Sequence, residues 1–332
     1  MSHNSSACYL VDKSDGPEPY GCLADVDFPD LLDGEVLIEV SYSSLNYKDA
    51  MAAKGHPGIV KSLPHVPGID AVGHVVESRD ATWRAGDVVI ATGHELGVER
   101  WGGWSSLLIS PGNWLVKLPD GLSEVEVMTL GTAGFTAAQC VEVLLRHGVE
   151  PDDGKIIVSG ATGGVGSLSV MLLANLGYDV VAVTGKEDQH DWLRLLGAAE
   201  VVGREVLQAE KRPLLSAEFA AGIDTVGGTV LATMLKKIQH RGCIACCGVA
   251  GGGDLPTTVY PFILRGLALY GIDSAWCPDD LRVDIWHKLA TDWKLESLEQ
   301  IRVDLKLDTV GSAVEQILAG AFAGRGVIQI SD

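Results

Sequence analysis

Residues 155–166 have the sequence KIIVSGATGGVG, and this stretch decides the fold of the chain. Its first five residues predict a buried parallel strand, and the residues from Gly164 to Leu176 have apolar side chains at helical spacing. Glycines fill the turn between them, where the backbone must bend sharply and let a pyrophosphate approach the N–H groups of the helix N-terminus. We therefore predict a dinucleotide-binding turn, in a variant that has Ala161 where the commonest fingerprint has its first glycine.

The end of the next strand, residues 179–184, indicates which dinucleotide binds. An NAD-selective site usually has an acidic residue there to bind the ribose 2′-hydroxyl, but this chain has Lys186. With Thr184 beside it and Arg204 after the following strand, the region can bind a 2′-phosphate. We therefore predict NADP(H) as the cofactor. The alternative is that Lys186 is a solvated loop charge, because lysines lie mostly on the surface.

The composition is that of an ordinary enzyme of two domains. The chain has 332 residues, 47% of them hydrophobic, and 40 glycines, which is enough for two cores. A net charge of −19 argues against nucleic-acid binding, which requires a basic surface. No apolar run reaches membrane-spanning length, and the N-terminus lacks the basic and apolar parts of a signal peptide. We therefore expect a cytoplasmic protein.

The cysteines allow two interpretations. Seven cysteines, an odd number in a long chain, do not indicate a disulfide framework. Cys243, Cys246 and Cys247 lie close together in the sequence and could indicate a metal cluster. No second ligand pair follows at the spacing of a zinc site, so we interpret residues 241–248 as a strand inside the sheet, with cysteine as a small apolar residue. We predict no metal.

The pattern of turns divides the chain. Glu35–Val40 alternates like a half-buried strand, and prolines and glycines separate short strands around it, which predicts a β-rich lobe. After this lobe, strands alternate with helices, which predicts an α/β domain with a doubly wound parallel sheet. A last short strand at 327–330 should rejoin the first lobe. The predicted domains are a β-rich domain of residues 1–125 and 273–332 and a dinucleotide-binding domain of residues 126–272.

Short motifs along the chain together resemble one family. They are Ser43–Ala50, Val66–Asp70, Trp101–Gly103, Gly131–Ala137, Asp224–Gly228, Pro261–Gly266 and Gly271–Ser274. The chain resembles the medium-chain dehydrogenase/reductase superfamily, its zinc-free quinone-oxidoreductase-like branch, and the subgroup that contains acrylyl-CoA reductase. The motifs LNYKD at 45–49 and FILRG at 262–266 are specific to the subgroup. The resemblance implies a Rossmann domain that binds NADP(H) and a GroES-like catalytic domain.

The resemblance also identifies what the chain lacks. Zinc-dependent members have a cysteine where this chain has Asn46, and a His-Glu pair where it has Ile69 and Asp70. The pair His94-Glu95 has the letters of the zinc motif but falls too far along the chain to align with it, so we interpret it as a loop of the catalytic lobe. Alcohol oxidation needs a Lewis acid to stabilise an alkoxide, whereas reduction of an activated carbon–carbon double bond does not.

Two polar residues are the candidates for this reduction. Hydride transfer to the β-carbon of an α,β-unsaturated thioester leaves negative charge on the carbonyl oxygen, and one donor aimed at that charge contributes roughly 3–4 kcal/mol. The resemblance places Asn46 and Tyr47 beside the nicotinamide, so we predict both as catalytic and substrate-binding residues, with Asp49 in a supporting role. Tyr47 could instead protonate the α-carbon, or be an aromatic residue at the edge of the core.

The resemblance implies further contacts with the cofactor and the substrate. In so acidic a chain, Arg265 and Arg325 could hold the phosphates of coenzyme A through bidentate hydrogen bonds, or either could pair with one of the 44 acidic residues. We predict Arg265 as a substrate-binding residue and Arg325 as a cofactor-binding residue. Ala323 stands where the subgroup often has the first arginine of an Arg-Gly-Arg motif. The other predicted cofactor residues are Thr132 near the nicotinamide, Thr162, Gly163, Gly164, Val165 and Gly166 at the pyrophosphate, and Gly248, Val249, Ala250 and Ile272 near the carboxamide.

Three functions remain open. The first is NADPH-dependent reduction of a short enoyl-CoA, with acryloyl-CoA giving propionyl-CoA, and this preference rests on the resemblance. The second is an NADPH:quinone oxidoreductase that acts on small quinones, and the third is a non-catalytic NADPH-binding structural protein, which the polar segment 46–49 disfavours. The apolar residues 262–264 and 267–270 predict a homodimer that continues the sheet across a two-fold axis, unless they are core residues.

Overall fold

The computed structural model describes residues 5–13 and 20–331. The absence of a signal peptide was predicted from residues 1–6, of which residues 1–4 lie outside this part. Contacts divide the chain into two compact units, one of residues 1–132, 275–290 and 301–332 and the other of residues 133–274 and 291–300. The predicted domain boundaries differ from this division at the first junction, by two residues at the second junction, and at residues 291–300, and they stay a prediction.

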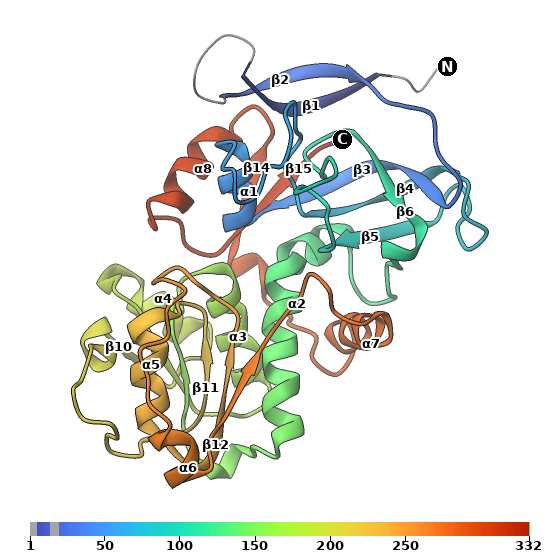
Figure 1. The fold of residues 1–332 in the computed structure, drawn as a ribbon. Helices are drawn as coiled ribbons and strands as arrows, with labels where there is room; N and C mark the ends of the chain where they lie inside the picture. The colour runs from blue at the N-terminus through green and yellow to red at the C-terminus, as the bar shows by residue number, and fades with distance from the viewer. Residues whose placement is uncertain (1–4, 14–19, 332) are drawn as a thin grey trace. The chain divides into compact units, whose positions relative to one another are not determined.

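The first unit contains a seven-stranded sheet. Its strands follow the order β14-β15-β3-β4-β5-β7, and β6 pairs with β3. Alternate residues of β3, such as Val36 and Ile38, pack against Val75 of β4 in one apolar cluster. Figure 1 shows β15, from the C-terminal part of the chain, beside β3, and their antiparallel pairing confirms that the tail strand rejoins the first lobe. The strands are β3 (Glu35–Leu45), β4 (Asp70–Ser78), β5 (Val88–Thr92), β6 (Leu107–Pro111), β7 (Leu115–Lys117), β14 (Arg302–Lys306) and β15 (Arg325–Gln329).

Short helices and a two-stranded sheet complete the first unit. The sheet pairs β1 (Ser5–Asp12) with β2 (Tyr20–Asp27) in antiparallel fashion. Helix α1 (Tyr47–Ala53) follows β3 directly and packs with α8 (Val310–Leu318). Helix α7 is formed by Asp279–Ala290. Because α1 begins at the end of β3, the residues at its start lie at one end of the sheet.

The second unit confirms the predicted doubly wound parallel sheet. Its strand order is β10-β9-β8-β11-β12-β13, and all its strand pairs are parallel. The order reverses between β8 and β11, and ligands bind at such a point outside the carboxyl ends of the strands. The cysteine-rich segment is strand β12, which lies between β11 and β13 as predicted. The strands are β8 (Ile156–Val158), β9 (Val180–Val183), β10 (Glu200–Val202), β11 (Phe219–Asp224), β12 (Ile238–Cys246) and β13 (Ala268–Gly271). The helices are α3 (Gly164–Asn175), α4 (His190–Leu195), α5 (Gly228–Lys237) and α6 (Tyr260–Arg265).

Helix α2 (Glu124–His147) corrects one prediction. Among the described residues it is the one helix that is long and apolar enough to cross a membrane, so the statement that no apolar run reaches that length was wrong. However, 89% of its most apolar window is buried inside the protein, as in the core helix of a globular protein. The helix is interrupted at Gly131, whose φ of 50° and ψ of −156° are not helical.

Candidate active site

The glycine turn, residues 159–163, has the close contacts expected of a dinucleotide site. Gly160 has a φ of +59°, and a side chain on Gly166 would place its Cβ 2.3 Å from the carbonyl oxygen of Gly160. The hydroxyl of Ser159 donates a hydrogen bond of 2.6 Å to the buried carboxylate of Asp224, which ties the turn to β11. Helix α3 and the turn therefore pack so closely that only glycine fits at both positions.

The N-terminus of α3 is suited to an anion. No side chain caps it, because Gly163 is its N-cap residue. A Cβ on Gly163 would meet no atom closer than 3.4 Å, so the space in front of the turn is open. The first N–H groups of a helix have no partner within the helix and attract phosphate groups. The arrangement of residues Thr162 to Gly166 therefore suits a pyrophosphate, and their contact with one stays a prediction.

The residues predicted to bind the 2′-phosphate lie together. The Oγ1 of Thr184 lies 3.5 Å from that of Thr162 and accepts a 3.1 Å hydrogen bond from the backbone N–H of Lys186. The Arg204 side chain lies against Gly185, where an added Cβ would come within 2.5 Å of its Nε. Burial lowers the pKa of Lys186, and the charge of Arg204 lowers it further against the opposite effect of Asp188. Two cations this close favour a doubly charged anion, so these residues fit NADP(H).

The other predicted cofactor residues of this unit follow two neighbouring strands. Gly248, Val249 and Ala250 come after the end of β12, and Ile272 follows β13. The backbone N–H of Ile272 donates a 3.0 Å hydrogen bond to the carbonyl of Cys246. These residues lie at the carboxyl edge of the sheet, where the glycine turn also lies. Their contact with the cofactor stays a prediction.

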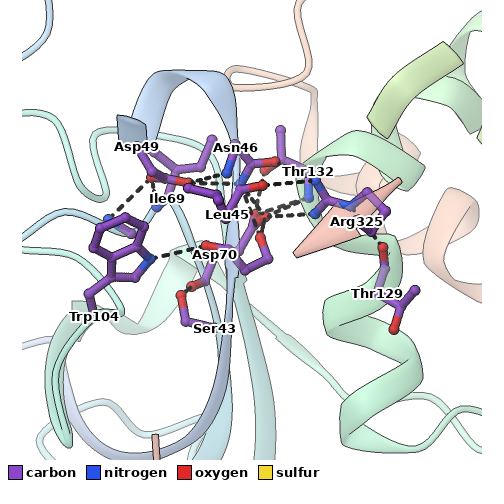
Figure 2. A network of polar contacts seen from close by, with 12 residues as sticks. Ser43, Leu45, Asn46, Asp49, Ile69, Asp70, Trp104, Thr129, Thr132 and Arg325 are labelled. Carbon is purple, nitrogen blue, oxygen red and sulfur yellow. Dashed lines mark hydrogen bonds and ion pairs between the residues drawn. The ribbon is translucent and has the colours of Figure 1, made fainter. Parts of the chain in front are cut away.

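Asp70 is the centre of a buried hydrogen-bond network in the first unit, and Figure 2 shows it from close by. It is the first residue of β4 and is fully buried. Its carboxylate accepts hydrogen bonds from the hydroxyl of Ser44 at 2.5 Å, the amide of Asn46 at 2.8 Å, and the N–H and hydroxyl of Thr132 at 2.9 and 2.5 Å. Asp70 therefore fixes Thr132, which directly follows the irregular residue Gly131.

The amide of Asn46 is fully engaged in this network. Its Nδ2 lies 3.0 Å from the hydroxyl of Ser44, 3.0 Å from Asp49 Oδ2 and 2.8 Å from Asp70 Oδ2, although an amide has only two hydrogens to donate. Its Oδ1 accepts a 3.0 Å hydrogen bond from Arg325. No hydrogen is left for a substrate oxygen. This geometry revises the predicted role of Asn46 as a direct donor and favours a role in ordering the network.

Asp49 connects helix α1 to the turn before β4. Its Oδ1 accepts hydrogen bonds from the backbone N–H groups of Gly68 and Ile69, and its Oδ2 accepts one from the N–H of Asn46 in a capping box. Burial raises the pKa of this fully buried carboxyl group to about 7, and the charge of Asp70 adds to the effect, while the hydrogen bonds oppose it. Asp49 therefore holds the segment that carries Asn46 and Tyr47.

Arg325 is the cation of the network. Its side chain is only 2% exposed. Its Nε donates to the carbonyl of Thr129 at 2.9 Å, and its Nη1 donates to Asn46 Oδ1 and to the carbonyl of Leu45. Its Nη2 lies 3.9 Å from Asp70 Oδ2. Burial lowers the pKa of the guanidinium, and the two carboxylates oppose this. The predicted contact of Arg325 with a phosphate is therefore not supported, because its side chain is an internal countercharge.

Tyr47 and Arg265 differ sharply in exposure. Tyr47, at the start of α1, is 50% exposed and directly follows Asn46 of the buried network. Arg265 is only 9% exposed and donates hydrogen bonds to the backbone carbonyls of Lys236, Ile238 and Leu215. This arrangement corrects the prediction that Arg265 holds a substrate phosphate, because its guanidinium instead joins residues 236–238 to Leu215.

A cavity of about 300 Å³ lies near the same end of the first unit's sheet. Its wall contains His94, which follows β5 by two residues and has a φ of 52°. Thr92, the last residue of β5, pairs with Asp70. The imidazole stacks on Trp114 with ring centroids 4.9 Å apart and meets the ring of Trp276 edge-on. Within residues 5–13 and 20–331, neither ring nitrogen has a hydrogen-bond partner. Burial lowers the pKa of His94 to about 4, so it is neutral at pH 7.

Comparisons with known proteins place this geometry in a family. Residues 32–120 match the alcohol dehydrogenase GroES-like domain, and residues 164–285 match the zinc-binding dehydrogenase model. The chain is 40% identical to the acrylyl-CoA reductase AcuI of Ruegeria pomeroyi over 97% of this chain and 98% of that protein. The chain belongs to the medium-chain dehydrogenase/reductase superfamily. It is an oxidoreductase of the quinone-oxidoreductase-like branch that includes the acrylyl-CoA reductases, as its motifs predict.

Other relatives of this chain are named as a quinone oxidoreductase or simply as an oxidoreductase. YhfP of Bacillus subtilis, which has a quinone oxidoreductase name, is 46% identical over 91% of this chain and 92% of its own length. The YhdH oxidoreductase of Salmonella enterica, crystallised with NADP, matches with a TM-score of 0.94 at 40% identity, over 98% of this chain and all of that chain. The YhfP structure, which holds NAD, also has a TM-score of 0.94, at 43% identity over 98% of this chain and 99% of that chain. The fold and the predicted two-domain class are thereby confirmed.

The residues do not fit the zinc ion that the name of the second model implies. The amide of Asn46 and the carboxylate of Asp70 bond to each other, and the guanidinium of Arg325 takes the position of a cation beside them. In the described part of the chain, no group of three or more His, Cys, Asp or Glu side chains lies together as a metal site. We therefore derive no chemical step through a metal.

Proposed function

We propose that the protein uses NADPH to reduce the activated carbon–carbon double bond of a short enoyl-CoA, with acryloyl-CoA giving propionyl-CoA. The observation that carries this proposal is the network around Asp70, in which the residues at the positions of zinc ligands are bonded to one another. Such a site suits a reaction that builds charge on a conjugated carbonyl oxygen. The acrylyl-CoA reductase AcuI of Ruegeria pomeroyi, which aligns along almost the whole chain, supports the choice of substrate.

The cofactor of this family is NADP(H), and the residues of the second unit suit it. The glycine turn would hold the pyrophosphate, while Lys186 and Arg204 would hold the 2′-phosphate. When bound, the reduced nicotinamide supplies a hydride to the β-carbon of the double bond. The cation pair argues for NADPH over NADH in this chain, because NADH has a hydroxyl in place of the phosphate and offers no negative charge to the neighbouring Lys186 and Arg204.

Tyr47 is the proposed donor to the substrate. The residue is half exposed, whereas the hydrogens of the neighbouring Asn46 amide are used within the protein. A phenol that donates to the thioester oxygen would stabilise the negative charge as the hydride arrives. The buried partners of Asn46 fix the backbone from which Tyr47 projects, so the hydroxyl would be held in place before the reaction begins.

A second candidate function is the reduction of small quinones. The name of the YhfP relative, which is more similar in sequence than AcuI, favours it. A quinone oxygen also gains negative charge when it accepts a hydride equivalent, so the same donor would serve both reactions. The two functions differ in one respect, because a quinone has no phosphates or amide groups to bind.

The test is anaerobic oxidation of NADPH and NADH by the purified protein. Acryloyl-CoA, crotonyl-CoA and benzoquinone are offered in parallel, and the products are identified by mass spectrometry. NADPH-specific formation of propionyl-CoA is expected. Quinone turnover without thioester reduction would transfer the proposal to the second candidate, and NADPH binding without any turnover would contradict both.

We also propose a cytoplasmic homodimer. Strand β13 forms one edge of the six-stranded sheet, and the neighbouring helix α6 exposes Ile263 and Leu264 at 68% and 55%. An apolar surface beside an open sheet edge suits pairing with a second copy. All seven cysteines are free, which fits a reducing compartment. Light scattering at several protein concentrations should give twice the mass of the chain.

A further inference from the structure

Two carboxylates and an amide belong to the same buried network as Arg325. Asp49 and Asp70 are fully buried, Asn46 is 9% exposed and Arg325 is 2% exposed. A buried carboxylate is strongly destabilised unless a cation or several hydrogen bonds compensate its charge. The guanidinium of Arg325 lies 3.9 Å from Asp70 Oδ2 and donates a hydrogen bond to Asn46 Oδ1. The network therefore depends on it for charge balance.

The guanidinium also fixes the orientation of the amide. A guanidinium only donates hydrogen bonds, so the atom of Asn46 that faces it must be the oxygen. The amide nitrogen then points toward Asp49 and Asp70. With the amide turned round, two donors would face each other at Arg325 and two acceptors would face each other at Asp70. One cation therefore determines the direction of the hydrogen bonds on both sides.

The network continues from Asp70 to Thr132. The carboxylate accepts both the N–H and the hydroxyl of Thr132, and Gly131 beside it lies so close that an added Cβ would come within 2.5 Å of Asp70 Oδ2 and 2.7 Å of Arg325 Nη2. Arg325 also binds the carbonyl of Thr129 in the preceding turn of α2. The guanidinium thus contacts the irregular turn of α2 on one side and the segment before Tyr47 on the other.

We infer that Arg325 is a positioning residue, a fixed organic cation that takes the place of a metal ion in this site and holds Thr132 and the Asn46–Tyr47 segment in the geometry required for hydride transfer. This inference rests on the proposed function in so far as Thr132 and Tyr47 are proposed to lie at the nicotinamide and the substrate. It assigns to Arg325 neither a phosphate contact nor a proton transfer. Its charge and its planar fork are both needed, because the three directed bonds come from two edges of the guanidinium.

The test uses Arg325→Ala with added guanidinium ion. We expect a loss of kcat of about 10- to 100-fold with an unchanged Kd for NADPH, as is typical when a supporting residue is removed. Guanidinium chloride at low, non-denaturing concentration should restore at least part of kcat and raise the melting temperature. Urea has the same planar shape and N–H groups but no charge, so it should restore neither. Equal rescue by urea, or no rescue by guanidinium, would overturn the inference.

Two further variants guard against a general loss of structure. Arg265→Ala removes another buried arginine that binds three backbone carbonyls but no carboxylate. It should lower stability, keep kcat nearly unchanged and show no rescue. Arg325→Lys keeps the charge and loses the fork, and it decides the question if Arg325→Ala does not fold. We expect it to fold with a kcat about tenfold lower, and a wild-type kcat would refute the need for the fork.

The outcome is separable from that of the proposed substrate. Melting temperature and NADPH affinity are measured without any substrate, and kcat is measured with whichever acceptor the wild-type protein reduces. If acryloyl-CoA is not reduced but a quinone is, the proposed function fails and the guanidinium experiment is still performed in full. If rescue is absent for the accepted substrate, the inference about Arg325 fails by itself.

Discussion

The substitution Gly131→Ala is the most direct perturbation of the Asp70 network, because it adds a single methyl group at its centre. Gly131 has a φ of 50° and a ψ of −156°, a region that is open almost only to glycine and costs another residue about 1–3 kcal/mol. The added Cβ would lie 2.5 Å from Asp70 Oδ2, which is closer than such atoms can approach. The carboxylate or the turn must therefore move.

The loss of stability can be estimated from the hydrogen bonds that this movement breaks. Loss of one hydrogen bond to a charged group costs about 1.5–3 kcal/mol. Together with the backbone strain, we expect Gly131→Ala to lower the free energy of unfolding by about 3–6 kcal/mol. Because Thr132 would move with the turn, kcat should also fall by about 10- to 100-fold.

Urea denaturation followed by tryptophan fluorescence measures the stability, and steady-state kinetics measure kcat. The matched control is Gly86→Ala in the same unit, since Gly86 has a φ of +91° and no atom within 4 Å of an added Cβ. Its free energy of unfolding should fall only by the backbone strain, about 1–2 kcal/mol, and its activity should be unchanged. If Gly131→Ala is no less stable than Gly86→Ala, or if it keeps wild-type kcat, the reasoning about the network is refuted.

Three further predictions concern other residues. Removing the charges of Lys186 and Arg204 together should raise KM for NADPH at least tenfold and leave KM for NADH nearly unchanged, because only NADPH has the 2′-phosphate; equal effects on both cofactors would contradict the assignment. Tyr47→Phe should lower kcat by about 10²- to 10³-fold without a change in NADPH binding, as measured by fluorescence titration, and an unchanged kcat would remove Tyr47 from the reaction. The pKa of His94 falls from its usual value to about 4 on folding, so the unfolded chain takes up the proton first as the pH drops. Wild-type stability should therefore decline relative to His94→Asn between pH 6.5 and 4, and parallel urea midpoints over that range would disprove this.

Local sequence was sufficient to predict the second unit. The glycine turn is formed by consecutive residues, and its backbone requirements leave few alternatives to glycine. The cluster of Thr184, Lys186 and Arg204 was also predictable, because parallel strands bring their carboxyl ends to one edge of the sheet. The segment of β12 that contains the cysteines could be interpreted as a strand and not a metal site, because no second ligand pair follows it in the sequence.

The network of the first unit could not be derived in the same way. Its members come from β3, α1, β4, α2 and β15, and no local pattern shows that Arg325 meets Asn46, 279 residues earlier. The resemblance drew attention to Asp70 only as a replaced zinc ligand. The sequence could not show that both hydrogens of the Asn46 amide are used within the protein, because its hydrogen-bond partners are brought together only by the fold.

The late position of Arg325 has a consequence for the synthesis of the chain. Ribosomes add about 5–20 residues per second, so the residue that balances Asp49 and Asp70 is made on the order of tens of seconds after Asn46. Until then β3 also lacks its neighbour β15. The residues of the second unit are synthesised after Asn46 and before Arg325, so this unit can fold first. During that time the first lobe is an incomplete sheet whose buried acidic groups have no countercharge from Arg325. A nascent chain that stalls before residue 325 would therefore present that lobe to chaperones and proteases in an unfinished state.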